Sequence, residues 1–338
     1  MPLKGHAAIA GEFAYNSRMN VPRLIHFAQG LRLSHETILL TSLLVVASCT
    51  THPASEATMI REATPTPTST APYVPVSPTL TPESATPTPF ICDENWQLLP
   101  VIPDVPEAAR ILYQQGLAQG NNARAFSKIG DGEISTDWFL TAFDLDEGQY
   151  DVGRYQNLTT IIETFRSSYG RSSAAARRGF NTHLILDSAA SDPKLCHADE
   201  SPLDCELRIH NPSVAILSLG TNQVHRPEEF EAGMHHILDV LVSKKVLPIL
   251  STKGDNLEGD HRINRIIACL AQEYQIPLWN FWAAIQPLPD HGLQPDLEHL
   301  TYSGINDFDD PTAMQSAWTV RNLTALQVLD AVWRAVAE

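Results

Sequence analysis

The chain has 338 residues, of which 39 are acidic and 23 are basic, so its formal net charge is −16. This acidic balance argues against nucleic acid or an anionic membrane surface as the main partner, because both would repel the protein. Hydrophobic residues make up 43% of the sequence, which is typical of a globular protein.

The first predicted element is an export signal over residues 1–49. Residues 37–46 form an apolar run that is too short to span a bilayer as a helix but fits the core of a signal peptide. The run leads into Val-Ala-Ser-Cys, which ends at Cys49 and resembles a bacterial lipobox. We therefore expect lipidation of Cys49 to hold the protein at a membrane, on the extracytoplasmic side of the bacterial cell envelope. The true start, Met1 or Met19, is left open.

A tether is predicted over residues 50–91. This stretch is rich in proline, threonine and serine, and Thr-Pro-Thr-Pro occurs at 64–67 and again at 86–89. Such a composition has too little apolar surface to pack and favours an extended, disordered linker. The remaining residues, 92–338, have the length of one α/β domain.

The domain contains four cysteines. Cys196 and Cys205 flank a short polar segment, and in an oxidising compartment a disulfide that closes this loop is the expected state. Neither belongs to a Cys-x-x-Cys pair, which argues against a zinc site. Cys269 lies on a helical apolar pattern and is expected to be a buried free thiol, whereas the pattern around Cys92 leaves its role open.

Short apolar runs predict four strands, at 125–129, 214–217, 246–250 and 276–281. The runs are nearly continuous rather than alternating, which is typical of strands buried on both faces of a parallel sheet. Pro248 argues against a central position for the third strand, because proline lacks the backbone donor.

Helical apolar patterns lie between and after these strands. One begins at Pro227 with acidic residues in its first turn, a second runs over 263–274, and a third over about 322–336. Strands that alternate with helices predict an α/β fold, with a parallel sheet covered on both faces.

Three polar motifs follow predicted strands. Gly130-Asp131-Gly132 follows the first strand, Gly220-Thr221-Asn222 follows the second, and Asp296 and His299 come after the last. Ligands of parallel sheets bind beyond the carboxyl ends of the strands, so these motifs are expected to meet there. An imidazole with a carboxylate three residues away can serve as a base and its orienting group.

In this order the three motifs resemble the sequence blocks of the SGNH (GDSL) hydrolases. The resemblance implies a three-layer α/β/α sandwich with a flavodoxin-like parallel sheet, and hydrolysis of carboxylic esters such as acyl or acetyl groups on glycans or lipids. It implies that His299 is the base and Asp296 its orienting acid. It further implies that Asn222 and the backbone amide of Gly179 donate to the oxyanion. In the position of the nucleophilic serine, this chain has Gly132.

A glycine in the nucleophile position leaves three interpretations open. In the first, the site is inactive and the domain is a non-catalytic surface lipoprotein that binds a glycan or lipid. In the second, Ser135 or Thr136 replaces the nucleophile from the same segment. In the third, Asp131, Glu133 and His299 together activate a water molecule.

No cofactor is expected, because the sequence contains neither a Gly-x-x-x-x-Gly-Lys nor a Gly-x-Gly-x-x-Gly motif. A metal is not expected either, since His235 and His236 lack a second pair of ligands. The segment 253–256 is expected to face the cleft, with a solvated loop as the alternative. The identity of the substrate and the oligomeric state do not follow from the sequence.

The tryptophans of the C-terminal part suggest a second kind of contact, because aromatic rings can stack on sugars. Trp279, Trp318 and Trp333 are expected to pack in the core. Trp282, beside two alanines, is the one tryptophan kept as a candidate for ligand stacking.

Overall fold

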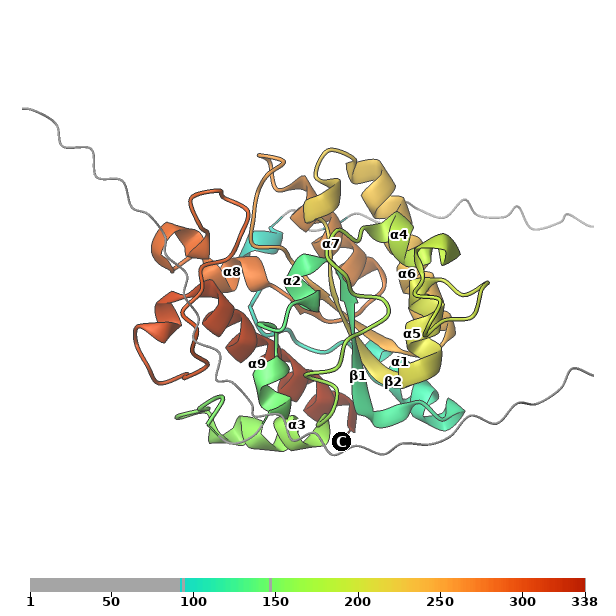
Figure 1. The fold of residues 1–338 in the computed structure, drawn as a ribbon, viewed down its shortest axis with the longest axis horizontal. Coiled ribbons are helices and arrows are strands. Elements are labelled where there is room, and N and C mark those ends of the chain that lie inside the picture. The colour runs from blue at the N-terminus through green and yellow to red at the C-terminus, as the bar shows by residue number, and fades with distance from the viewer. Residues whose placement is uncertain (1–91, 93–94, 146–147, 338) are drawn as a thin grey trace, which may run out of the picture. The chain divides into compact units, whose positions relative to one another are not determined.

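The computed structural model describes Cys92, residues 95–145 and residues 148–337. The expected export signal and tether lie outside these residues. The described strands form one parallel sheet in the order β1-β2-β3-β4 (Figure 1). With helices packed against it, this sheet confirms the predicted α/β class.

The four strands correspond to the four predicted apolar runs. Their bounds are β1 Asn122–Gly130, β2 Pro212–Ser218, β3 Leu247–Ser251 and β4 Leu278–Trp279. Every residue of β2 and β3 is buried, as their continuous apolar sequences predict. The strands therefore form the centre of the core, and their carboxyl ends lie at one edge of the sheet.

Pro248 lies inside β3, between β2 and β4, where a proline was not expected. It pairs with Ala215 of β2, whereas the pairing of β3 with β4 begins only at Leu250, opposite Leu278. At Pro248 the strand therefore has a paired neighbour on one side only, which explains how a residue without a backbone donor fits there.

Three of the five longer helices, those that begin at Pro227, Arg262 and Ala317, agree with the predicted patterns, whereas the other two and several short ones were not predicted. The helices of at least nine residues are α1 Glu107–Gln119, α5 Pro202–His210, α6 Pro227–Ser243, α7 Arg262–Glu273 and α9 Ala317–Ala337. The shorter ones are α2 Gly132–Ser135, α3 Thr159–Thr164, α4 Thr182–Leu186 and α8 Phe281–Ile285. Among the described residues, none of these helices combines the length and hydropathy that a bilayer-spanning segment needs.

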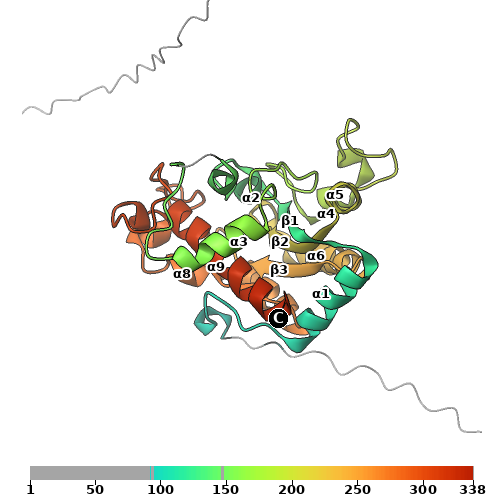
Figure 2. The same cartoon turned by 90° about the horizontal axis from the view of Figure 1, so that it is seen from below.

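Two groups of helices cover the sheet. Each strand is followed in the sheet by the next strand of the chain, and the connections between them contain α5, α6 and α7 in turn. Because such crossovers are right-handed and all run in the same direction, they place these three helices on one face of the sheet. α1 and α9 contact each other, and α1 also contacts β2 and β3 (Figure 2). The arrangement is a three-layer α/β/α sandwich.

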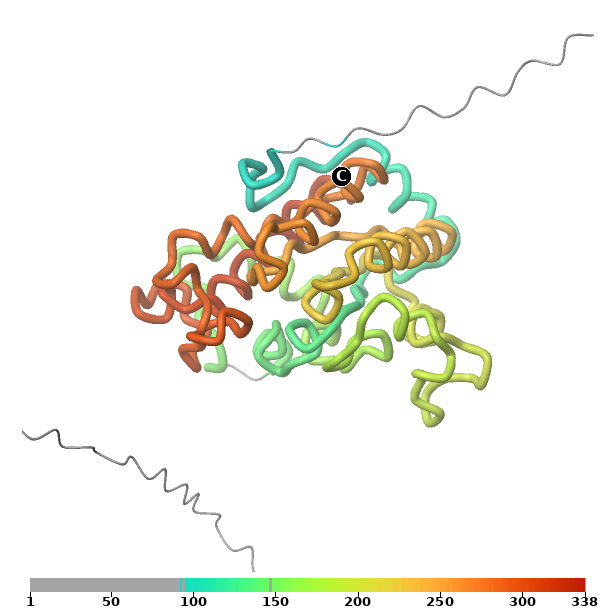
Figure 3. The backbone as a smooth tube through the Cα atoms, turned by 90° about the horizontal axis from the view of Figure 1, so that it is seen from above, coloured from blue at the N-terminus to red at the C-terminus, as the bar shows by residue number. Residues whose placement is uncertain are grey.

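Two disulfides occur in the described part of the chain. Cys196 and Cys205 are bonded, as predicted, with Cα atoms 5.2 Å apart, and the bond joins the segment before α5, which extends from the body in Figure 3, to the beginning of α5. The prediction of a free thiol at Cys269 is wrong, because Cys269 is bonded to Cys92, with a Cα separation of 5.2 Å. The helical pattern around Cys269 gave no sign of a partner so distant in sequence. Disulfides are typical of proteins that fold in an oxidising compartment.

Candidate functional site

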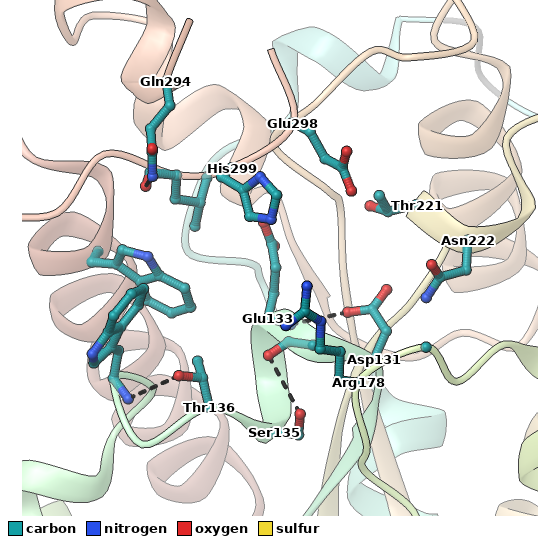
Figure 4. Close-up of a pocket in the computed structure, with 15 residues that line it drawn as sticks. Asp131, Glu133, Ser135, Thr136, Arg178, Thr221, Asn222, Gln294, Glu298 and His299 are labelled. Atoms are coloured by element: carbon teal, nitrogen blue, oxygen red, sulfur yellow. Dashed lines mark hydrogen bonds between the residues drawn. The ribbon is translucent and has the colours of Figure 1, made fainter. Parts of the chain in front are cut away.

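A pocket of about 810 Å³ lies at the carboxyl edge of the sheet (Figure 4). Its walls come from the segment after β1, the turn after β2, the loop before α4 and the loop before α9. The lining residues are Asp131, Gly132, Glu133, Ser135, Thr136, Trp138, Arg178, Gly179, Thr221, Asn222, Gln294, Glu298, His299, Leu300 and Trp318. Of the six predicted site residues, five line this pocket, and the sixth, Asp296, touches it through His299.

Gly132 is the first residue of α2, directly after the capping residue Asp131. The Asp131 carboxylate accepts a hydrogen bond from the amide of Glu133 at 3.2 Å, which fixes the start of this short helix. The φ angle of Gly132 is not in the left-handed region. A Cβ atom at Gly132 would lie 3.7 Å from Cγ and 4.0 Å from Cα of Arg178, which is ordinary van der Waals contact. The fold therefore does not require a glycine at this position.

Asp296 and His299 form a hydrogen-bonded pair within one tight turn. Nδ1 of His299 lies 2.8 Å from Oδ2 of Asp296, and the amides of Glu298 and His299 both donate to Oδ1 at 3.0 Å. These amide donors, followed by the imidazole, lower the pKa of Asp296 to about 2. An ionised carboxylate requires the proton on Nδ1, so Nε2 is left as an acceptor.

The predicted oxyanion donors lie across the pocket from His299. Nδ2 of Asn222 donates to the carbonyl of Phe180 at 2.8 Å, and the neighbouring Gln223 accepts from the amide of Thr182 at 2.9 Å. These two contacts tie the turn after β2 to the loop that holds Gly179. Gly179 has a φ of +83°, and no heavy atom lies within 4 Å of a Cβ built on it. The side-chain amide of Asn222, which has a second hydrogen, and the uncovered backbone at Gly179 thus lie on the same wall of the pocket.

Ser135 and Thr136 line the same pocket but do not contact His299. The Ser135 hydroxyl donates to the carbonyl of Gly132 at 3.4 Å, and the Thr136 hydroxyl accepts from the amide of Trp138 at 3.4 Å. In Figure 4 both hydroxyls lie below Glu133, and His299 lies above it. This arrangement favours neither residue as a replacement nucleophile activated by His299.

The side chain of Glu133 extends towards His299 across the floor of the pocket (Figure 4). It is 20% exposed, and its Oε2 lies 3.5 Å from Nη1 of Arg321. Burial raises the pKa of Glu133, and the positive charge of Arg321 opposes this rise. Burial, together with the charge of Glu133, raises the pKa of Asp131 to about 7. Two acids beneath the pocket are therefore easier to protonate than carboxyls in water.

Arg321 was not predicted from the sequence. It lies on α9 and is fully buried, its Nη2 donates to the Ser218 hydroxyl at 2.8 Å, and its Nε and Nη1 have no hydrogen-bond partner. Its guanidinium carbon lies 4.5 Å from the ring centre of Phe281 and 5.1 Å from those of Phe139 and Trp279. The sequence did not single it out, because the same helix carries other polar residues such as Asn322 and Asp330.

The segment 253–256 does not line the pocket, so the prediction that it faces the cleft is wrong. The alternative of a solvated loop is wrong as well, because two of its charged residues are buried. Lys253 is 2% and Asp255 is 1% exposed. Nζ of Lys253 lies 2.5 Å from Asp255 Oδ1 and 2.7 Å from Glu258 Oε2. Asp255 accepts a hydrogen bond at 2.7 Å from the hydroxyl of Thr221, which lines the pocket, so this ion cluster supports the pocket wall.

Within the described ranges, no group of three or more histidine, cysteine, aspartate or glutamate residues could hold a metal ion. His235 instead contacts the hydroxyl of Tyr274, at 3.0 Å from Nδ1.

No known protein family and no curated protein matches the sequence. Among solved structures, the chain is similar to AlinE4, an esterase of the SGNH-hydrolase family, with 20% identity over 53% of this chain and 86% of that chain, at a TM-score of 0.34. It is also similar to a GDSL-like lipase from Bacteroides thetaiotaomicron, with 14% identity over 59% of this chain and 92% of the other, at a TM-score of 0.33. Both TM-scores are low, so the function of this chain has to be argued from its own residues.

Proposed function

We propose that this domain has the site of an SGNH-type carboxylic-ester hydrolase without its nucleophile, and that it binds an ester-bearing ligand without forming an acyl-enzyme. The observation that carries the proposal is Gly132, which opens onto the same pocket as the Asp296–His299 pair and has room for a side chain. Acyl transfer through a covalent intermediate needs an attacking oxygen or sulfur, and glycine has none.

The remaining groups can still hold an acyl ester. Nε2 of His299 can accept a hydrogen bond from a ligand hydroxyl, because Nδ1 is engaged by Asp296. The second amide hydrogen of Asn222 and the backbone at Gly179 are available to an ester carbonyl. Binding of this kind uses the same contacts that a hydrolase uses, without the covalent step.

A second function is supported by Glu133. Its carboxylate extends towards His299, and burial raises its pKa, which makes it a stronger base than a carboxylate in water. A water molecule between Glu133 and His299 could then attack an ester directly, and the proton would pass to one of these two bases. Hydrolysis by this route would be slow, because it lacks the covalent intermediate that divides the reaction into easier steps.

A direct assay separates the two functions. For the wild-type domain we expect no burst with 4-nitrophenyl acetate and no covalent adduct with a fluorophosphonate, as judged by intact-mass spectrometry. Slow turnover that is lost in both Glu133→Gln and His299→Ala, but kept in Ser135→Ala, would establish the water route instead. A fluorophosphonate adduct on Ser135, with turnover lost in Ser135→Ala, would overturn both functions.

We further propose that the domain is held at a cell surface by lipidated Cys49 and the tether 50–91. The apolar run, the lipobox-like sequence and the two disulfides of the domain support this location. Cys49→Ser should release the full chain from the membrane fraction or block its processing. Unchanged membrane retention and unchanged size of the variant would overturn the anchor.

A further inference from the structure

We infer that the ligand of this pocket is a neutral glycan, and that one of its sugar rings packs on an exposed outer face of the stacked pair Trp138 and Tyr302. The inference rests on the proposed function, because it names the class of ligand for the same site. We call the surface made by these two residues the aromatic platform.

The aromatic platform is exposed at the rim of the pocket. Trp138 is 47% and Tyr302 is 52% exposed, and they are the aromatic members of the exposed large hydrophobic residues in the described part of the chain. Trp138 lines the pocket, and Tyr302 lies three residues after His299. Both large exposed rings are thus found next to the proposed reacting groups, where an exposed apolar surface indicates a binding site.

The platform is held in a fixed orientation. The rings of Trp138 and Tyr302 stack with centres 4.4 Å apart and an interplanar angle of 22°. Trp318 meets Trp138 edge-on, with centres 5.8 Å apart at 74°. Asn322 of α9 donates to the backbone carbonyl of Trp138 at 2.9 Å. A ring ordered in this way loses little conformational freedom when a ligand binds.

The pocket walls favour a sugar over a lipid chain. Apart from its two glycines, the apolar lining residues are Trp138, Trp318 and Leu300, and the other side chains of the lining are polar. An acyl chain would leave these polar groups without hydrogen bonds, which is costly. A pyranose has a face of C–H groups that packs on an aromatic ring, and hydroxyls that can bond to polar side chains such as Gln294 and Glu298.

The charge of the pocket favours a neutral sugar. Asp131, Glu133 and Glu298 line it together with one arginine, Arg178. The whole chain also carries a formal net charge of −16. The net charge of the chain would repel an anionic polysaccharide and the pocket offers it a single arginine, whereas a neutral, acylated glycan meets no such repulsion.

Trp282, the tryptophan predicted to stack on a ligand, does not lie at the pocket. Its ring packs edge-on against Trp96, with centres 5.1 Å apart, and against His261 at 5.4 Å. The choice of Trp282 as the stacking residue is therefore wrong, and the proposed stacking residue is Trp138 instead.

Calorimetric titration with non-acylated oligosaccharides tests the inference without any ester chemistry. We expect the wild-type domain to bind at least one of xylohexaose, cellohexaose or chitohexaose. Trp138→Ala should weaken this binding about tenfold, as the loss of one aromatic contact predicts. Trp138→Phe should restore part of it. Leu98→Ala is the matched control, because Leu98 is 84% exposed but lies outside the pocket lining.

Three results would overturn the inference. One is the absence of binding to all three oligosaccharides, and another is equal affinity of wild type and a folded Trp138→Ala variant. The third is binding of short-chain phosphatidylcholine micelles in place of sugars, lost in Trp138→Ala, which would assign the platform to a lipid. None of these results touches the question of the missing nucleophile, which the esterase assays on Gly132 variants decide separately.

Discussion

Replacing Gly132 by serine should create an esterase. The substitution places a hydroxyl in the pocket that His299 and Asn222 also line, with Asp296 bonded to the imidazole. The new Cβ would make ordinary contacts of 3.7 and 4.0 Å with Arg178, and the backbone is not in the left-handed region. We therefore expect the free energy of unfolding to change by about 0.5 kcal/mol or less.

The gain in rate follows from the groups already present. In subtilisin, removal of the serine alone costs nearly as much as removal of the whole triad, so restoring a missing serine should recover a large part of the effect. We expect Gly132→Ser to hydrolyse 4-nitrophenyl acetate about a thousandfold faster than wild type, which corresponds to about 4 kcal/mol of activation free energy. A burst phase and a fluorophosphonate adduct should accompany it.

Two controls isolate the hydroxyl and its base. Gly132→Ala adds the Cβ without the oxygen and should remain as slow as wild type. Gly132→Ser combined with His299→Ala should lose most of the gain, because the serine is no longer deprotonated. If Gly132→Ser folds with an unchanged unfolding midpoint but gains neither rate nor adduct over Gly132→Ala, position 132 is not the nucleophile position and the proposed function is refuted.

Three further predictions concern the surroundings of the pocket. The pKa of Asp131 is raised to about 7 in the folded protein, whereas its value in the unfolded chain is near 4. The protonated carboxyl therefore contributes fully to the free energy of unfolding below pH 4, and this contribution is lost as the pH rises towards 7. Asp131→Asn should therefore flatten the fall in unfolding free energy between pH 4 and pH 7, and an unchanged slope would contradict this account. Arg321→Met should destabilise the domain by about 3–5 kcal/mol in urea titrations, since it leaves Glu133 without its counter-charge, and adding Glu133→Gln should recover part of the loss. Reduction of the Cys196–Cys205 disulfide should cost about 2–3 kcal/mol on the chain-entropy estimate, and non-reducing peptide mapping that finds both thiols free would exclude the bond.

The sequence predicted the elements whose signals are local. The apolar runs that became β2 and β3 needed no tertiary information, because strands buried on both faces have continuous apolar sequences. The helix from Pro227 was marked by its proline and first-turn acids, and α6 begins at that residue. The pocket residues could be grouped because parallel strands end at one edge of a sheet.

The features that the sequence did not predict depend on contacts between distant segments. Arg321 and Glu133 are 188 positions apart in the chain, and nothing local to either residue indicates the other. The bond between Cys92 and Cys269 spans 177 positions, and the helical pattern around Cys269 suggested only burial. Nothing in the sequence singled out Trp138, because exposure depends on which segments cover a ring, and this is a tertiary property.

The turn that holds Asp296 and His299 has a consequence for how this site could have changed over evolutionary time. The hydrogen bonds of Asp296 join residues at most three positions apart, and they also order the loop itself. The pair can therefore persist through selection on folding alone, long after turnover has ceased. Some glycine and serine codons differ by a single base, so a lineage with this loop could exchange a receptor for an enzyme, and return, without rebuilding the acid and the base.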